Sequence, residues 1–188
     1  MRHIPNALCF LRMLLVLPVA WLLVTDNYRL TLAMFFFAAA TDGLDGFLAK
    51  RFGWTSELGK IIDPLADKIL LVGVFITLAA LGVVPVWLAA TAVARDVIIT
   101  AGAITYKYLF SYGELQGRPT AVSKLNTLCQ IIYLLLVVAA RAYDFTPKVA
   151  ITVLGALVFV TTVVSGLDYV ISYSRKAVEV SRRQRGLA

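Results

Sequence analysis

Residues 42–67 read DGLDGFLAKRFGWTSELGKIIDPLAD, and this stretch decides what kind of fold the chain can adopt. Apolar segments long enough to cross a membrane lie on both sides of it. The stretch contains four aspartates, Asp42, Asp45, Asp63 and Asp67. A carboxylate beside hydrocarbon is costly, so four of them in one stretch indicate a functional site.

The spacing of these aspartates predicts how they are arranged. Asp42 and Asp45 are three positions apart. Asp63 and Asp67 are four apart, so each pair lies on one face of a helix. Two such faces opposed to each other form a cage of oxygen ligands, which suits a hard divalent cation such as Mg²⁺. One or two ions held there would leave open positions for phosphate oxygens.

The composition is that of an integral membrane protein. Of the 188 residues, 60% are hydrophobic, whereas soluble domains are about 45–50% apolar. A spanning helix needs about 20 mostly apolar residues, and the candidate segments are residues 7–24, 30–49, 60–81, 84–109, 121–141 and 147–172. We therefore predict an all-α membrane protein with six transmembrane helices, in which residues 1–188 form a single domain.

The distribution of lysine and arginine predicts the orientation of these helices. Twelve basic residues fall on one side of the predicted membrane: Arg2, Lys50, Arg51, Lys60, Lys107, Arg118, Lys124, Arg175, Lys176, Arg182, Arg183 and Arg185. The other side has Arg29, Arg141 and Lys148. The positive-inside rule then places both termini in the cytoplasm, with the basic tail 173–188 and the aspartate stretch. In a membrane protein the net charge of +7 indicates contact with anionic membrane lipids and not with nucleic acid.

Residues between the aspartates support a nucleotide site on the cytoplasmic side. Gly43, Gly46 and Gly59 permit the close approach that a nucleotide or diphosphate needs. Lys50 and Arg51 supply positive charge at the same membrane depth. This assembly suits the transfer of a phosphoryl-type group between a cytoplasmic nucleotide and a molecule in the bilayer.

The stretch resembles the signature of the CDP-alcohol phosphatidyltransferases, which runs D-x2-D-G-x2-A-R-x8-G-x3-D-x3-D. Every spacing is kept, and one position differs, because Lys50 stands where the family usually has arginine. The charge survives this change, but the planar bidentate guanidinium does not. The matching residues are Asp42, Asp45, Gly46, Ala49, Lys50, Gly59, Asp63 and Asp67.

The resemblance implies a reaction and a role for each aspartate. CDP-diacylglycerol binds with its diphosphate on Mg²⁺ or Mn²⁺, with two ions expected. An acceptor hydroxyl then attacks the phosphorus that bears diacylglycerol, and CMP leaves. The first three aspartates, here Asp42, Asp45 and Asp63, are metal ligands in this family. The fourth, Asp67, would be the base for the acceptor hydroxyl and could also reach a metal.

The resemblance also implies residues that bind the CDP-lipid. Gly46, Ala49, Lys50 and Gly59 would line the nucleotide site. In the first helix, two polar residues could reach the diphosphate: Asn6 and Arg12. Asn6 could equally well cap that helix, so both roles remain open for it.

Basic residues in the later segments predict an acceptor that carries phosphate. Arg95, Arg118 and Lys124 together could form an anion pocket. Two alternatives stay open. Arg95 could be a structural partner of an aspartate, and Lys124 could anchor the helix at the interface.

Two branches of the family use such acceptors. CMP-forming cardiolipin synthases take phosphatidylglycerol, and phosphatidylglycerol-phosphate synthases take glycerol 3-phosphate. Residues 4–6 with Arg12 are similar to both, whereas residues 118–130 resemble the cardiolipin branch. So do Asn126 and Asp96, where the other branch tends to have lysine and glutamate. The phosphodiester of a lipid acceptor also carries one negative charge, whereas glycerol 3-phosphate carries about two. A lipid acceptor therefore needs fewer cations in its binding site. We expect cardiolipin synthesis, with phosphatidylglycerol-phosphate synthesis as the alternative.

Other hypotheses explain less of the sequence. Interfacial ion pairs with Lys50, Arg51, Lys60 or Lys68 account for one or two aspartates, but not for four at helical spacing. A small ion transporter gives no reason for the fixed offsets of the glycines. By analogy with the family we expect a homodimer. We also expect a bacterial inner membrane location, since the chain begins directly at the first helix, with the active site facing the cytoplasm.

Overall fold

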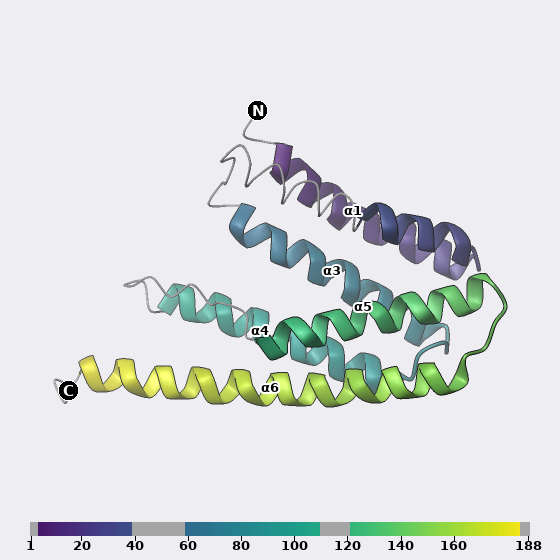
Figure 1. Cartoon of the computed structure of the whole chain (residues 1–188). Coiled ribbons are helices and arrows are strands. Elements are labelled where there is room, and N and C mark those ends of the chain that lie inside the picture. Colours follow the sequence, from purple (N-terminus) through teal and green to yellow (C-terminus); the bar gives the residue numbers. More distant parts are fainter. Residues whose placement is uncertain (1–3, 39–58, 110–120, 185–188) are drawn as a thin grey trace.

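The computed structural model describes residues 4–38, 59–109 and 121–184, and every regular element in these ranges is a helix (Figure 1). The elements are α1 (Ile4–Val24), the helical stretch Tyr28–Ala38, α3 (Gly59–Ala80), α4 (Val86–Leu109), α5 (Ala121–Ala142) and α6 (Lys148–Gln184). The prediction of an all-α chain is confirmed for the described residues. The second predicted segment begins as expected, but its part from residue 39 to 49 lies outside them.

The last helix is longer than predicted. The sixth apolar segment was expected to end at residue 172, whereas α6 has 37 residues and continues into the basic tail. No glycine or proline stands between Tyr173 and Gln184, and lysine, arginine and glutamate are good helix formers. At 1.5 Å per residue α6 is about 55 Å long, so it exceeds the roughly 30 Å hydrocarbon core of a bilayer.

Backbone-capped turns join the helices in pairs. After α3, Gly82 has a positive φ of 69°, its N–H donates to the carbonyl of Ala79, and the N–H of Val83 donates to Leu78. This is the Schellman arrangement that ends a helix. Asp26 (φ 56°) stands in the same position after α1. The chain therefore reverses within a few residues at both places.

The helices run up and down alongside one another (Figure 1). Three short turns, at residues 25–27, 81–85 and 143–147, lie at one end of the bundle, which we call the turn end. The start of α1 and the end of α6 lie at the opposite end. Because the helices alternate in direction, the start of α3, the end of α4 and the start of α5 also lie at that opposite end. Residue contacts link α1 with α3, α3 with α4, α4 with α6, and α5 with α6.

Apolar side chains form both the core and much of the described surface. Leu23, Leu78 and Val138 are fully buried, and the rings of Phe75 and Tyr133 stack with centroids 6.4 Å apart. Large apolar side chains are exposed on every described helix. The most exposed include Leu17, Trp21, Phe36, Ile76, Val86, Leu125 and Val149. A soluble monomer rarely exposes so much contiguous apolar surface, so this surface suits hydrocarbon.

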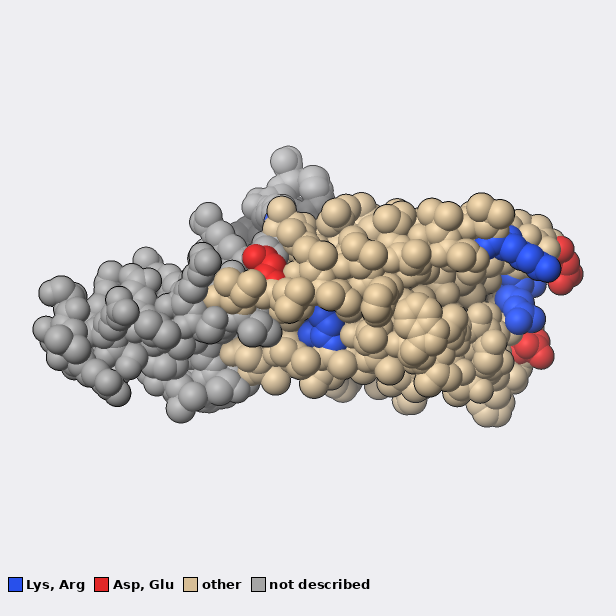
Figure 2. All heavy atoms as spheres, turned by 90° about the horizontal axis from the view of Figure 1, so that it is seen from below, with Lys and Arg blue, Asp and Glu red and all other residues tan. Residues whose placement is uncertain are grey.

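Charged side chains on the described surface gather mostly at the turn end (Figure 2). Exposed residues next to the turns there are Asp26, Arg29, Arg141, Asp144 and Lys148. In the described residues, two helical stretches are long and apolar enough to cross a membrane, Ala121–Ala142 and Lys148–Tyr169. Shorter apolar stretches are Met13–Val24, Tyr28–Ala38 and Lys68–Ala80. The number of spans and their orientation stay predictions.

Candidate active site

The second aspartate pair lies on α3, near the end of the bundle that is opposite the turns. Asp63 and Asp67 are both within the helix, four residues apart, so they share one face at axial positions about 6 Å apart. The structure describes their backbone but not their side chains. The same is true of Asn6 and Arg12 in α1 and of Gly59 at the first position of α3. The remaining CDP-lipid candidates lie outside the described residues: Asp42, Asp45, Gly46, Ala49 and Lys50.

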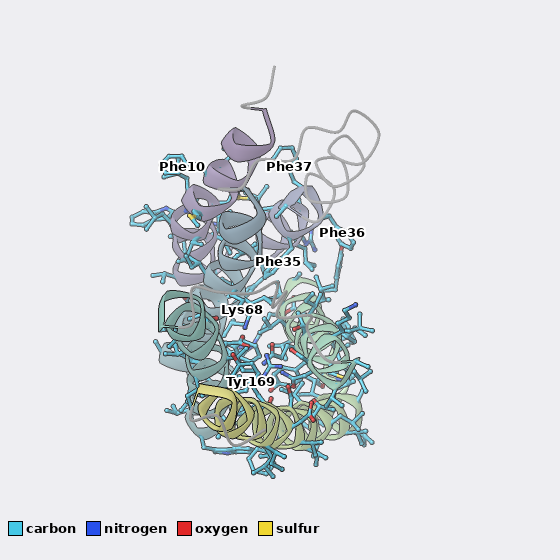
Figure 3. All side chains as sticks on the ribbon, turned by 90° about the vertical axis from the view of Figure 1, so that its left-hand side faces the viewer. Phe10, Phe35, Phe36, Phe37, Lys68 and Tyr169 are labelled. Atoms are coloured by element: carbon cyan, nitrogen blue, oxygen red, sulfur yellow. The ribbon has the colours of Figure 1, made fainter. Side chains whose placement is uncertain are left out.

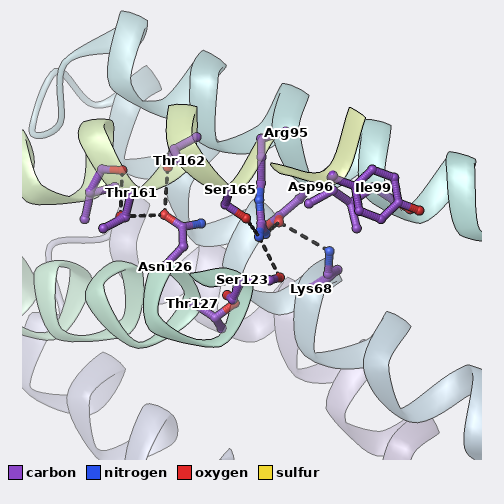
Figure 4. A network of polar contacts seen from close by, with 12 residues as sticks. Lys68, Arg95, Asp96, Ile99, Ser123, Asn126, Thr127, Thr161, Thr162 and Ser165 are labelled. Carbon is purple, nitrogen blue, oxygen red and sulfur yellow. Dashed lines mark hydrogen bonds and ion pairs between the residues drawn. The ribbon is translucent and has the colours of Figure 1, made fainter. Parts of the chain in front are cut away.

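A charged cluster begins one residue after this pair, with Lys68 half-buried and its two partners on α4 buried. Lys68 Nζ lies 3.3 Å from Asp96 Oδ1 on α4, and the guanidinium of Arg95 donates from Nη1 to the same oxygen (Figure 4). Arg95 is 4% exposed and Asp96 5% exposed. Viewed from the end where α1 begins, Lys68 lies inside the bundle, whereas Phe10, Phe36 and Phe37 lie at its outside (Figure 3).

Arg95 ties this cluster to two further helices. Its Nη2 donates to Ser123 Oγ on α5 at 2.7 Å and to Ser165 Oγ on α6. Its Nε is buried without a partner among the described residues. The cluster of Lys68, Arg95 and Asp96 contains two cations and one carboxylate, so the three described side chains carry one net positive charge. A net charge inside a bundle is costly unless an anion lies close to it.

A second polar cluster lies between α5 and α6, one turn away. Asn126 Oδ1 accepts hydrogen bonds from Thr161 Oγ1 at 2.8 Å and Thr162 Oγ1 at 2.9 Å. Asn126 and Gln130 are both buried. The Nδ2 of Asn126 and both amide atoms of Gln130 lack partners among the described residues. Ser165 and Thr162 are three residues apart on α6, so this helix connects the two clusters.

The structure thus separates the four acceptor candidates. Arg95 and Asn126 are buried in adjoining clusters, whereas Lys124 is exposed on α5 and Arg118 lies outside the described residues. The observed pairing of Arg95 with Asp96 matches the structural alternative for Arg95. One buried donor of Arg95, Nε, nevertheless has no partner among the described residues.

The predicted oxygen donors for a metal are the carboxylates of the aspartate stretch. Among the described side chains, no group of three or more histidine, cysteine, aspartate or glutamate residues comes together. The described backbone of α3 does fit the predicted ligand set, because it puts Asp63 and Asp67 on one face. Carboxylate oxygens at this spacing suit Mg²⁺ or Mn²⁺.

Residues 2–179 match the sequence model of the CDP-alcohol phosphatidyltransferases. The chain belongs to this family. Over 94% of its length it is 31% identical to the CMP-forming cardiolipin synthase of Homo sapiens, and it spans 63% of that protein's length. It is 29% identical over 89% of its length to the CDP-diacylglycerol–glycerol-3-phosphate 3-phosphatidyltransferase of Aquifex aeolicus, of which it spans 93%. A protein of the same name from Pseudomonas fluorescens is 31% identical over 73% of the chain and is itself covered to 72%.

Family membership explains the aspartate stretch but not the charged cluster. The sequence predicts Lys68 as a possible partner of the aspartates and indicates no role for Ser165. Among the described side chains, Lys68 donates to Asp96, and Ser165 accepts from Arg95. The available signal was a polar residue inside an apolar segment, which in a membrane helix usually faces the bundle interior.

Proposed function

We propose that this chain transfers a phosphatidyl group from CDP-diacylglycerol to the hydroxyl of a glycerol acceptor that carries phosphate, with release of CMP. The observation that carries the proposal is the complete aspartate signature over residues 42–67. Support comes from the described part of α3, whose helix keeps Asp63 and Asp67 on one face beside a buried cluster of net positive charge.

The proposed reaction has a defined proton acceptor and a defined leaving group. Asp67 accepts the proton of the acceptor hydroxyl as the new bond forms between that oxygen and the phosphorus bearing diacylglycerol. The bond from this phosphorus to CMP breaks, and CMP carries away the electron pair. Asp42, Asp45 and Asp63 would hold Mg²⁺ or Mn²⁺, which when bound offsets the charge of the diphosphate. Gly46, Ala49, Lys50 and Gly59, with Asn6 and Arg12 of α1, would bind the CDP-lipid.

Phosphatidylglycerol is the proposed acceptor, because residues 118–130, with Asp96 and Asn126, resemble the cardiolipin branch. A phosphodiester also carries one negative charge, whereas a phosphomonoester such as glycerol 3-phosphate carries about two and needs more cations to balance it. Arg95, Asn126, Lys124 and Arg118 would form the acceptor site. The second candidate, phosphatidylglycerol-phosphate synthesis, is favoured by the Aquifex aeolicus relative, which the chain matches over nearly its whole length.

The proposed setting is a bacterial inner membrane crossed six times, with both termini and the active site on the cytoplasmic side. The antiparallel arrangement supports this, because α1 begins and α6 ends at the same end of the bundle (Figure 1). The aspartates of α3 lie toward that end, where a cytoplasmic nucleotide would arrive. By analogy with the family we propose a homodimer.

Purified protein in detergent, given CDP-diacylglycerol and Mg²⁺, tests the proposal. Glycerol 3-phosphate and phosphatidylglycerol are supplied separately, and CMP and the lipid product are measured. We expect CMP and cardiolipin with phosphatidylglycerol. CMP with glycerol 3-phosphate alone would establish the second candidate. If no CMP is released with either of these acceptors or with any other alcohol, the proposed transferase activity is contradicted, and the ion-transporter hypothesis should be tested next.

A further inference from the structure

We propose that Lys68 is a positioning residue: its ion pair with Asp96 fixes the rotation of α3, and thereby aims Asp63 and Asp67. The inference rests on the proposed function, in which Asp67 is the base and Asp63 a metal ligand. Lys68 is the first residue after Asp67, so whatever holds its side chain also holds the last turn of the aspartate signature.

The partner of Lys68 is itself rigidly held. Asp96 is 5% exposed. Its Oδ1 forms ion pairs with both Arg95 and Lys68. Arg95 is in turn bonded to serines of α5 and α6. Of the ion pairs between described side chains, only that of Lys68 with Asp96 joins two helices. The pair therefore connects α3 to a frame made of three other helices.

Because of helical periodicity, the ion pair of Lys68 also determines the direction in which Asp63 and Asp67 project from α3. Successive residues are about 100° apart around the axis, so Lys68 is about 100° from Asp67 and about 140° from Asp63. With Lys68 directed at α4, both aspartates occupy a different face of α3. Rotation of α3 would be resisted at Lys68, because its ammonium would have to leave Asp96 and so lose the carboxylate that it pairs with inside the bundle.

The magnitude of the effect follows from the helix radius. A carboxylate at the rim of a helix lies about 5–6 Å from its axis, so a rotation of about 10° moves it by about 1 Å. Ligand distances in metal sites hold to about ±0.2 Å, and a misplacement of about 1 Å can cost about 100-fold in rate. A small loss of rotational control is therefore enough to impair the site.

The removal of Lys68 leaves the rest of the cluster balanced. Lys68→Met keeps the apolar stem, and Asp96 remains paired with Arg95, so no unpaired charge is created and the variant is expected to fold. This distinguishes Lys68 from Asp96, whose loss leaves two cations behind. A fixed register is also the best-attested use of a buried ion pair.

The test compares Lys68→Met and Lys68→Arg with wild type for kcat, KM and Mn²⁺ affinity by electron paramagnetic resonance. We expect kcat of Lys68→Met to fall about 10- to 100-fold, with the acceptor KM changed less than about threefold and weaker Mn²⁺ binding. Lys68→Arg, which can still pair with Asp96, should recover most of the loss. Lys148→Met, the same change at an exposed site at the turn end, is the matched control and should behave as wild type.

Two results would overturn the inference. One is a kcat and Mn²⁺ affinity of Lys68→Met equal to those of wild type. The other is a raised acceptor KM with unchanged kcat, which would make Lys68 a ligand of the acceptor phosphate. If Lys68→Met is not obtained folded, Lys68→Gln replaces it, since its side chain is one bond shorter and the same losses are expected. Absence of CMP release by wild type would refute the proposed function, while the Mn²⁺ comparison would still decide the role of Lys68.

Discussion

Asp96→Asn should be one of the most destabilising single changes in the described part of this protein. Asp96 is the carboxylate partner of two cations, Lys68 at 3.3 Å and Arg95 on the same oxygen. An asparagine keeps the volume but leaves both cations without a carboxylate partner among the described side chains, and Arg95 is only 4% exposed. Breaking a buried ion pair by removing one partner costs about 3–5 kcal/mol in the free energy of unfolding.

The expected loss can be expressed as a melting temperature. For a chain of about 150–250 residues, 1 kcal/mol corresponds to roughly 2–4 °C in Tm. Asp96→Asn should therefore lower Tm by about 6–20 °C, measured by thermal unfolding in detergent at neutral pH. Lys68→Met should cost clearly less, because Arg95 and Asp96 remain paired.

The matched control is Asp144→Asn. Asp144 is exposed at the turn end and has a φ of 53°, a conformation that asparagine also tolerates. Its Tm should stay close to that of wild type. A Tm of Asp96→Asn within about 2 °C of wild type, or a larger loss for Lys68→Met than for Asp96→Asn, would refute the charge argument.

Four further changes test other parts of the structure. Asp67→Asn should abolish CMP release while binding of the CDP-lipid, measured by equilibrium binding, persists; turnover like wild type would remove it as the base. Arg95→Lys loses the planar fork and should raise the acceptor KM at least tenfold in steady-state assays, whereas an unchanged KM would make Arg95 purely structural. Gly82→Ala should lower Tm by about 2–4 °C, since its φ of 69° costs other residues about 1 kcal/mol. Gln130→Leu should leave Tm unchanged or higher in the same melts, because it removes two buried atoms that lack partners in the described part of the chain; a clear loss would indicate a partner such as bound water.

The helices could be predicted from the sequence because each depends on local pattern. Apolar runs and their interruptions locate α1, α3, α4 and α5 to within a few residues. The predicted sixth segment, 147–172, agrees with the apolar stretch Lys148–Tyr169. The apolar pattern does not indicate that α6 continues to Gln184. A helix ends where its backbone is interrupted, and residues 173–184 contain neither glycine nor proline.

The side-chain partners could not be predicted in the same way. Arg95 and Asp96 stand out as charges in an apolar segment, and a structural pairing of Arg95 was one of the two readings left open. The ion pair of Lys68 with Asp96 depends on how α3 is rotated and shifted along its axis relative to α4. No local sequence pattern contains this information. The same holds for Asn126 and the threonines of α6. Compositional signals identify buried polar residues, but only the packed bundle shows which of them meet.

The arrangement of the bundle separates its apolar core from its polar clusters along the helix axes. On α3 and α5 the buried apolar residues follow the polar ones in sequence, Leu70–Leu78 after Lys68 and Tyr133–Val138 after Gln130. On α4 and α6, which run the other way, they precede them. The apolar half therefore lies toward the turns and the polar half toward the aspartates of α3.

This separation explains how the chain tolerates buried charge. Side chains such as Leu23, Leu78, Leu134 and Val158 fill the half near the turns. Thr31 is buried there too, and its hydroxyl donates to the carbonyl of Asn27. The apolar packing offsets the cost of desolvating the charged cluster. Polar side chains in the other half can then orient substrates and supply charge. A site that binds a diphosphate and a phosphate-bearing acceptor needs both orientation and charge, because its anions must be held where charge develops during transfer. The half of the bundle that holds the buried polar clusters is thus the half that carries the proposed chemistry.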